Sequence, residues 1–340
     1  MVLPEVSAAR TVRVYRRITL LILYGWYMID RRLQVLQAIA RHGTVTAAAE
    51  VCRLTPSAVS HQIQALSREL GVPLLEPVGR GVRLTPAART LLDHGQALTA
   101  RWEQARADLA AHRAGHVGGM LRFCGFSTAA AAIVPQAMER LRQEYPALRL
   151  HLRETEPARS FDLLAADDTD IAVVVVTTSI PPVSDEAFAQ QALYDEPLDL
   201  LVGPEHPLVG RGDGGLADVA ADPWIGSNPG RAYHQLVLLA CNAAGFSPDV
   251  AHYADEWDTG AALVARGFGV ALVPRLADLP ARHDTRRIPI SVPPVPIRRV
   301  IAGVRAGSAE QPTIAAGLEA LRQATAALSL TLDGPVTPTP

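Results

Sequence analysis

Polar side chains suited to recognising nucleic acid gather in the stretch TPSAVSHQIQAL, residues 55–66. Ser57, Ser60, His61 and Gln64 recur at helical steps, so they share one face of a helix. Hydroxyl, imidazole and amide groups donate to or accept from base edges and phosphate oxygens, and a helix N-terminus attracts phosphate. This face is therefore a candidate for contact with the major groove of B-DNA.

Three short helices are expected to position this face. The first runs from Asp30 and ends at His42–Gly43, and Thr44 is the expected N-cap of the second. The third starts at Thr55, with Pro56 at its first position, and ends at Gly71. A tight turn between the second and third helices gives a helix-turn-helix, which places a helix in the major groove. A solvated helix pair in an ordinary bundle is the alternative.

The segment VPLLEPVGRGVRLTP, residues 72–86, has the pattern of a small hairpin around a Gly-Arg-Gly turn. Its arginines Arg80 and Arg83 would act as a wing that contacts the DNA backbone or the minor groove. Arginine side chains commonly make such phosphate contacts.

A long helix is expected from Thr85–Pro86 to about Gly115. It carries an apolar seam at alternating steps of three and four residues: Ala88, Leu91, Gly95, Leu98, Trp102, Ala105 and Leu109. A seam of nearly four heptads predicts a partner helix and therefore a dimer. Packing against the same chain is the alternative.

The chain of 340 residues is long enough for two or three domains, and its net charge of −2 is unevenly distributed. Residues 1–27 and 28–95 each carry +3, so the remainder carries −8. Because the N-terminal part is basic and the remainder is acidic, we expect only the N-terminal part to contact a polyanion.

Enzymatic motifs are missing from the sequence. It has no nucleophile elbow, no phosphate-binding P-loop, no HExxH and no dinucleotide fingerprint, so we expect no enzyme and no cofactor. His112 and His116 have helical spacing but no third ligand, which argues against a metal site. The three cysteines are far apart and in apolar contexts, which favours core thiols over a redox switch.

The N-terminal segment 1–27 has an Arg-Arg pair before an apolar run that is too short to span a bilayer. We favour an upstream start codon assigned in error, with Met28 as the true start. A packed N-terminal extension and a secretion signal are the alternatives.

After residue 119, strand-like and helix-like runs alternate, which predicts βαβ units with parallel sheets. The length of this part indicates two lobes. The chain is expected to cross into the second lobe at residues 196–203 and to cross back at 298–304.

The run from Leu33 to Thr85 resembles the winged helix-turn-helix of the LysR-type transcriptional regulators. The resemblance is carried by the pair Ala48–Ala49, by TPSAVSHQIQAL and by the wing LLEPVGRGVRLTPA, and it extends to about residue 330. It implies an N-terminal all-α winged helix-turn-helix with a long linker helix, followed by a two-lobed α/β effector domain like a periplasmic binding protein. The implied domains are an extension (1–27), the DNA-binding domain (28–86), the linker helix (87–117), the effector domain (118–330, with lobe 1 at about 118–195 and 298–330 and lobe 2 at about 196–297) and a flexible tail (331–340).

The resemblance also implies a cytoplasmic, DNA-binding regulator of transcription that acts as a homodimer or homotetramer on an interrupted inverted repeat in a promoter. The implied DNA contacts are Thr55, Pro56, Ser57, Ser60, His61, Gln64, Arg80 and Arg83. The implied effector contacts are Ser127, Thr128, Thr155, Ser227, Arg231 and Val270.

A carboxylate-bearing effector would suit Ser127–Thr128 at one end of the site and Arg231 at the other. A neutral or aromatic ligand with one polar end is the alternative. The competing function is a two-lobed solute-binding receptor or a non-regulatory ligand-binding protein, although a solute-binding receptor needs a signal peptide and no helix-turn-helix.

Overall fold

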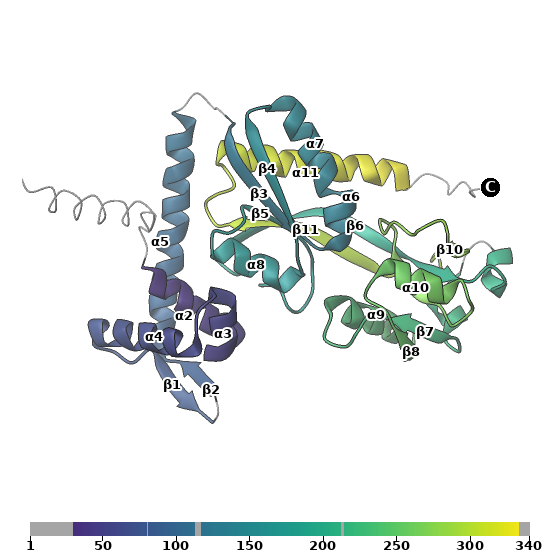
Figure 1. The fold of residues 1–340 in the computed structure, drawn as a ribbon, viewed down its shortest axis with the longest axis horizontal. Coiled ribbons are helices and arrows are strands. Elements are labelled where there is room, and N and C mark those ends of the chain that lie inside the picture. Colours follow the sequence, from purple (N-terminus) through teal and green to yellow (C-terminus); the bar gives the residue numbers. More distant parts are fainter. Residues whose placement is uncertain (1–29, 80, 113–116, 212–213, 333–340) are drawn as a thin grey trace, which may run out of the picture. The chain divides into compact units, whose positions relative to one another are not determined.

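The structure, a computed structural model, describes residues 30–79, 81–112, 117–211 and 214–332 (Figure 1). The chain divides into two compact units, Met1–Trp102 and Glu103–Pro340, and each is considered by itself. The alternatives for residues 1–27, the wing residue Arg80 and the histidine His116 lie outside the described residues.

The first unit contains the three expected helices: α2 (Arg31–His42), α3 (Val45–Cys52) and α4 (Pro56–Leu70). Thr44 accepts a hydrogen bond from the N–H of Ala47 at 3.1 Å, and Thr55 accepts one from Ala58 at 3.2 Å. These caps satisfy amide groups that a helix leaves unpaired at its start. The capping predictions for α3 and α4 are confirmed.

The core of the first unit is formed by one face of each helix. Its fully buried members include Leu36, Ala48, Ala49, Val59 and Ile63. The hairpin of β1 (Leu75–Val78) and β2 (Gly81–Leu84) follows α4 and pairs antiparallel, as predicted. The long helix α5 spans Pro86–Ala111 and crosses the boundary between the units.

The described part of the second unit holds a seven-stranded sheet in the order β10-β6-β11-β5-β3-β4, with β9 also paired to β6, and a separate parallel pair β7-β8. The strands are β3 (Gly119–Gly125), β4 (Leu148–Glu154), β5 (Ile171–Val175), β6 (Phe188–Val202), β7 (Pro223–Gly226), β8 (Asp249–Tyr253), β9 (Ala271–Pro274), β10 (Arg286–Pro289) and β11 (Ile297–Arg305). The helices are α6 (Ser127–Ala132), α7 (Val134–Glu144), α8 (Pro157–Ala165), α9 (Ala232–Ala243), α10 (Trp257–Val264) and α11 (Pro312–Leu332), with 3-10 turns η1 (Pro207–Gly210) and η2 (Leu216–Val219).

Strand β6 runs through both halves of this unit. Its first part pairs with β11 and its last part, residues 198–202, pairs with β9 and β10. We call the part built on β3, β4, β5, β11 and the start of β6 lobe 1, and the part built on β7–β10 and the end of β6 lobe 2. Each lobe has its own buried apolar clusters.

The expectation of parallel sheets is wrong for the central strands. The neighbours β4, β3 and β5 are parallel, as are β7 and β8, but β11 runs antiparallel to both β5 and β6. The physical reason is the path of the chain. It leaves lobe 1 along β6 and returns along β11, so two adjacent crossing strands must point in opposite directions.

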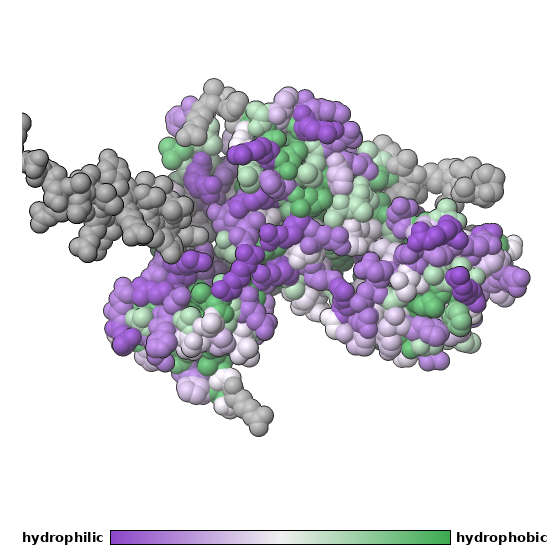
Figure 2. Space-filling view, viewed as in Figure 1, coloured by the Kyte–Doolittle hydropathy of each residue, from purple (hydrophilic) through white to green (hydrophobic). Residues whose placement is uncertain are grey.

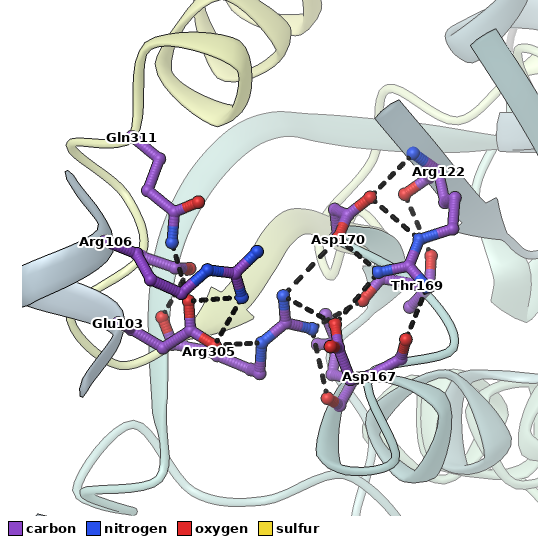
Figure 3. Close-up of polar contacts among 10 residues, drawn as sticks. Glu103, Arg106, Arg122, Asp167, Thr169, Asp170, Arg305 and Gln311 are labelled. Carbon is purple, nitrogen blue, oxygen red and sulfur yellow. Dashed lines mark hydrogen bonds and ion pairs between the residues drawn. The ribbon is translucent and has the colours of Figure 1, made fainter. Parts of the chain in front are cut away.

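A buried ion network fastens the end of α5 within the second unit (Figure 3). Arg305, at the end of β11, donates from Nε to the Glu103 carboxylate on α5 at 3.1 Å, and Gln311 Nε2 donates to the same carboxylate at 2.6 Å. The Arg305 guanidinium also donates to the Thr169 carbonyl at 2.7 Å and reaches Asp170 at 3.4 Å. Both Glu103 and Arg305 are about 5% exposed or less.

The surroundings of Asp170 show which effect dominates in this network. Burial by itself would raise the pKa of Asp170, but hydrogen bonds and the charges of Arg122 and Arg305 outweigh burial and lower it. The carboxylate therefore stays ionised and pairs with both guanidinium groups.

Glu103→Ala should destabilise the second unit by about 3 kcal/mol, because it leaves a buried cation with one fewer partner. Urea unfolding of the full chain, followed by circular dichroism, measures the change. Gln104→Ala is the matched control. Within the described part of the chain, Gln104 donates exposed hydrogen bonds to Asp108 and Glu310, so its replacement should cost about 0.5 kcal/mol or less. Equal midpoints for the two variants would contradict this account.

Candidate functional site

The polar face of α4 is accessible in the first unit. Thr55, Pro56, Ser57, His61 and Gln64 are exposed. Ser60 is half-buried, and the opposite side of the helix is anchored in the core. We call these six residues the recognition face. The structure therefore brings together the predicted DNA-contacting residues of α4.

The hairpin arginine Arg83 lies directly opposite Glu76 on the neighbouring strand, and their side chains form an exposed ion pair at 2.9 Å. An exposed pair of this kind contributes about 1 kcal/mol or less, so the guanidinium can exchange its partner for a phosphate at little cost.

A cavity of about 220 Å³ lies within the second unit, with walls from both lobes. Four of the six predicted effector residues line it: Ser127, Thr128, Ser227 and Arg231. Thr155 and Val270 are not among the lining residues, although their neighbours Glu154, Glu156 and Ala271 are. Val270 instead packs in the apolar core of lobe 2.

Sequence reasoning missed several residues that shape this cavity. Tyr233 and Trp257 meet edge to face at 5.1 Å and form an aromatic part of the wall. Burial raises the pKa of Tyr233, and its hydroxyl donates to the Leu272 carbonyl at 2.8 Å. The position of Trp257 at the start of a short helix, directly after Asp255 and Glu256, was the available signal.

A buried ion pair lies at the inner end of the cavity, where Arg298 is one of the lining residues. Arg298 on β11 and Glu196 on β6 are register partners and meet at 2.6 Å, with 3% and 0% of their side chains exposed. Arg298 also donates to the Thr128 hydroxyl at 2.9 Å. The Glu196 carboxylate further accepts the N–H of Leu276 at 2.8 Å.

The mouth of the cavity carries a second, more exposed cluster of charges. Arg231, the N-cap of α9, contacts Glu156 of lobe 1 and lies 3.3 Å from Asp255 of lobe 2. Asp255 also accepts hydrogen bonds from the backbone and side chain of Asn228, and these bonds together with Arg231 lower its pKa. Arg231 is therefore already engaged by two carboxylates.

Ser227 has an unusual position in the wall. Its side chain is buried, with the residue 7% exposed, and among the described residues its hydroxyl has no hydrogen-bond partner. A buried hydroxyl without a partner is unfavourable, and such groups usually find one.

Two of the three cysteines, Cys124 and Cys241, lack the surroundings of a reactive thiolate. Burial raises the pKa of Cys124 and raises the pKa of Cys241 to about 12, and both are fully buried. Cys52 is half-buried in the first unit. In the described residues, no group of three or more histidine, cysteine or carboxylate side chains could hold a metal ion.

On the face shown in Figure 2, hydrophobic residues appear in separate patches among hydrophilic ones. Within the described ranges, we find no helix with the length and apolar character needed to cross a membrane.

Family comparisons match both units. Residues 31–89 match the bacterial regulatory helix-turn-helix protein model of the lysR family, and residues 114–326 match the LysR substrate binding domain. The chain is 30% identical over 252 residues to the DNA-binding transcriptional dual regulator OxyR of Escherichia coli, covering 74% of this chain and 81% of OxyR. It is 28% identical over 268 residues to the transcriptional dual regulator GltC of Bacillus subtilis, covering 78% of this chain and 87% of GltC.

Solved structures show the same fold. A hydrogen peroxide-bound OxyR mutant of Corynebacterium glutamicum matches with a TM-score of 0.57 at 23% identity, covering 90% of this chain and 96% of that one. Full-length BenM matches with a TM-score of 0.54 at 22% identity, covering 91% of this chain and 99% of that one.

Thr128→Val should lower the stability of the second unit by about 1–3 kcal/mol, because the buried Arg298 loses an acceptor while the side-chain shape is kept. Thr128→Ser, which keeps the hydroxyl, should cost less. Urea unfolding of the two variants tests this difference. A Val variant as stable as the Ser variant would show that the hydroxyl does not support Arg298.

Proposed function

The chain belongs to the LysR family of transcriptional regulators, and we propose which of its residues read DNA and which receive its effector. It is a DNA-binding regulator with an effector-binding domain, and its relatives are regulators rather than enzymes. The match to the helix-turn-helix family favours this function over a solute-binding receptor.

We propose that the side chains of the recognition face contact base edges in the major groove. The observation that carries this proposal is that α4 presents exposed polar side chains at an N-terminal end capped by Thr55, while Val59, Ile63 and Leu66 hold the helix in the core. A helix anchored in this way can insert its first turns into the major groove. Arg83, and by the sequence Arg80, would contact the backbone beside the helix.

The proposed assembly is a homodimer, or a tetramer built from dimers, on an interrupted inverted repeat. The seam of α5 has two different parts. Its first part is buried within the first unit, where a Cβ at Gly95 would lie 3.3 Å from the Leu33 side chain. Farther along, Leu98 and Leu109 are 59% and 63% exposed. Apolar side chains at heptad positions that the described residues leave exposed favour a partner helix.

The cavity of the second unit is the proposed effector site. It combines hydroxyl groups, an aromatic wall and charged groups at its mouth, which is the usual composition of a small-molecule site. The proposal of a carboxylate-bearing effector depends on Arg231 as its partner. Since Arg231 contacts Glu156 and Asp255, such an effector would have to displace one of these carboxylates.

Peroxide sensing does not follow from the similarity to the hydrogen peroxide-inducible genes activators of Escherichia coli and Pectobacterium carotovorum. A reactive cysteine needs an accessible thiol with a lowered pKa. Cys124 and Cys241 have the opposite properties, since both are buried and their pKa values are raised. We therefore propose that this regulator responds to a bound small molecule.

Changes at the recognition face and at the hairpin should have different effects on DNA binding. His61→Ala should weaken binding to the preferred site by about 1–3 kcal/mol and leave binding to scrambled DNA nearly unchanged. Arg83→Ala should weaken binding to both and lower the salt slope by about one phosphate contact. Glu76→Gln should strengthen binding to both, because it frees Arg83 from its ion pair.

Fluorescence anisotropy over a range of salt concentrations measures these effects, with duplexes from the DNA upstream of the regulator's own gene. An equal loss on specific and scrambled DNA for His61→Ala would contradict the role of the recognition face.

Leu98→Asp should convert a dimer into a monomer, because a charge in an apolar helix interface is costly. Ala97→Asp is the matched control, since Ala97 is exposed on the same helix but lies outside the seam. Size-exclusion chromatography with light scattering measures the mass. A wild-type monomer, or an equal effect of both variants, would contradict the proposed interface.

A further inference from the structure

We infer that the cavity of the second unit takes an organic cation, a small molecule with an aromatic or apolar body and one protonated amine. This inference rests on the proposed effector site and names the class of ligand that the site selects. It follows from the charges at the mouth, the position of Arg231 and the unpartnered hydroxyl of Ser227.

Carboxylates outnumber cations among the residues that line the cavity. Glu154, Glu156, Asp255 and Glu256 contribute four negative charges, against the two positive charges of Arg231 and Arg298. Arg298 is also paired with the buried Glu196, which does not line the cavity, so this carboxylate neutralises the charge of Arg298. Partly enclosed charges of one sign raise the local concentration of ligands of the opposite sign.

Arg231 shows that a cation fits at the mouth. Its guanidinium extends from the start of α9 to Glu156 in one lobe and Asp255 in the other. Both carboxylates remain partly exposed, with 54% and 25% of their side chains accessible, so a ligand amine can share them or replace Arg231. An anionic ligand would have to separate Arg231 from its partners and then remain beside the carboxylates that it displaced.

The wall farther inside the cavity would contact the aromatic or apolar body of the ligand. Tyr233 and Trp257 supply aromatic surface, and Leu236 and Val273 supply aliphatic surface. The hydroxyl of Ser227, buried and without a partner, is available for one hydrogen bond. A cavity of about 220 Å³ suits a compact molecule with one ring.

Three probes of matched size separate the charge classes: 2-phenylethylamine, 2-phenylethanol and phenylacetate. Each is titrated into the full-length wild-type protein at pH 7 and low salt, with ligand-observed NMR as the readout. The amine should bind at least about tenfold more tightly than the other two, a difference of about 1.4 kcal/mol. Raising the salt concentration should weaken binding of the amine and leave the alcohol unaffected.

Three variants, one of them a control, locate the effect. Glu156→Gln should weaken amine binding about fivefold or more without changing alcohol binding. Glu186→Gln is the control, because Glu186 is exposed and does not line the cavity, and it should change neither. Ser227→Ala should weaken the amine and the alcohol to a similar degree.

Equal or tighter binding of phenylacetate, or no binding of the amine at millimolar concentrations, would overturn the inference. DNA binding is measured in parallel by fluorescence anisotropy with the upstream DNA. This measurement distinguishes a failure of the inferred ligand class from a failure of the proposed function. If the protein binds DNA but the cavity does not prefer the amine, the inferred ligand class is rejected and the DNA-binding function is retained. Amine binding in the cavity that never alters DNA binding supports the ligand class and rejects the cavity as the regulatory site.

Discussion

The buried pair of Arg298 and Glu196 is the interaction on which the second unit depends. Each charge is almost fully removed from water, so neither can lose the other without a large penalty. The pair sits where β6 and β11 cross between the lobes. It also orders Thr128 through a hydrogen bond and Phe126 through a cation–π contact at 4.8 Å. A rearrangement that separated β6 from β11 at this point would break the pair and leave two buried charges without partners.

Strand β11 connects two charge networks. Arg298 is near its start, beside the cavity, and Arg305 is its last residue, bound to Glu103 of α5. Seven residues of extended strand span about 23 Å. A ligand that binds two arrangements of the lobes with different affinity therefore acts on a strand that is also fastened to the linker helix. The two pairs at the mouth, Arg231 with Glu156 and with Asp255, are more exposed and can exchange partners at lower cost.

Local signals made the first unit predictable from sequence. Thr44 and Thr55 cap helices and Gly71 ends one because of interactions within a few residues, and such interactions leave a pattern in the sequence. The second unit depends on partners far apart in the chain. Arg231 meets Glu156 across 75 residues and Arg298 meets Glu196 across 102, and no local pattern marks such pairs. The first half of β6 has no continuous apolar pattern, and it gains its place in the sheet by pairing with β11.

Membership of a family leaves open which signal a regulator detects, because the signal is read by the residues of one site. The apolar wall of the cavity can discriminate only weakly, since one methylene changes binding by about 1–3 kcal/mol. Charge at the mouth discriminates more strongly, because a ligand of the wrong sign meets repulsion and also leaves existing partners unpaired. Glu154 and Glu256, which line the cavity without pairing to Arg231, add to this repulsion. The carboxylates therefore set specificity by excluding anions as much as by attracting cations.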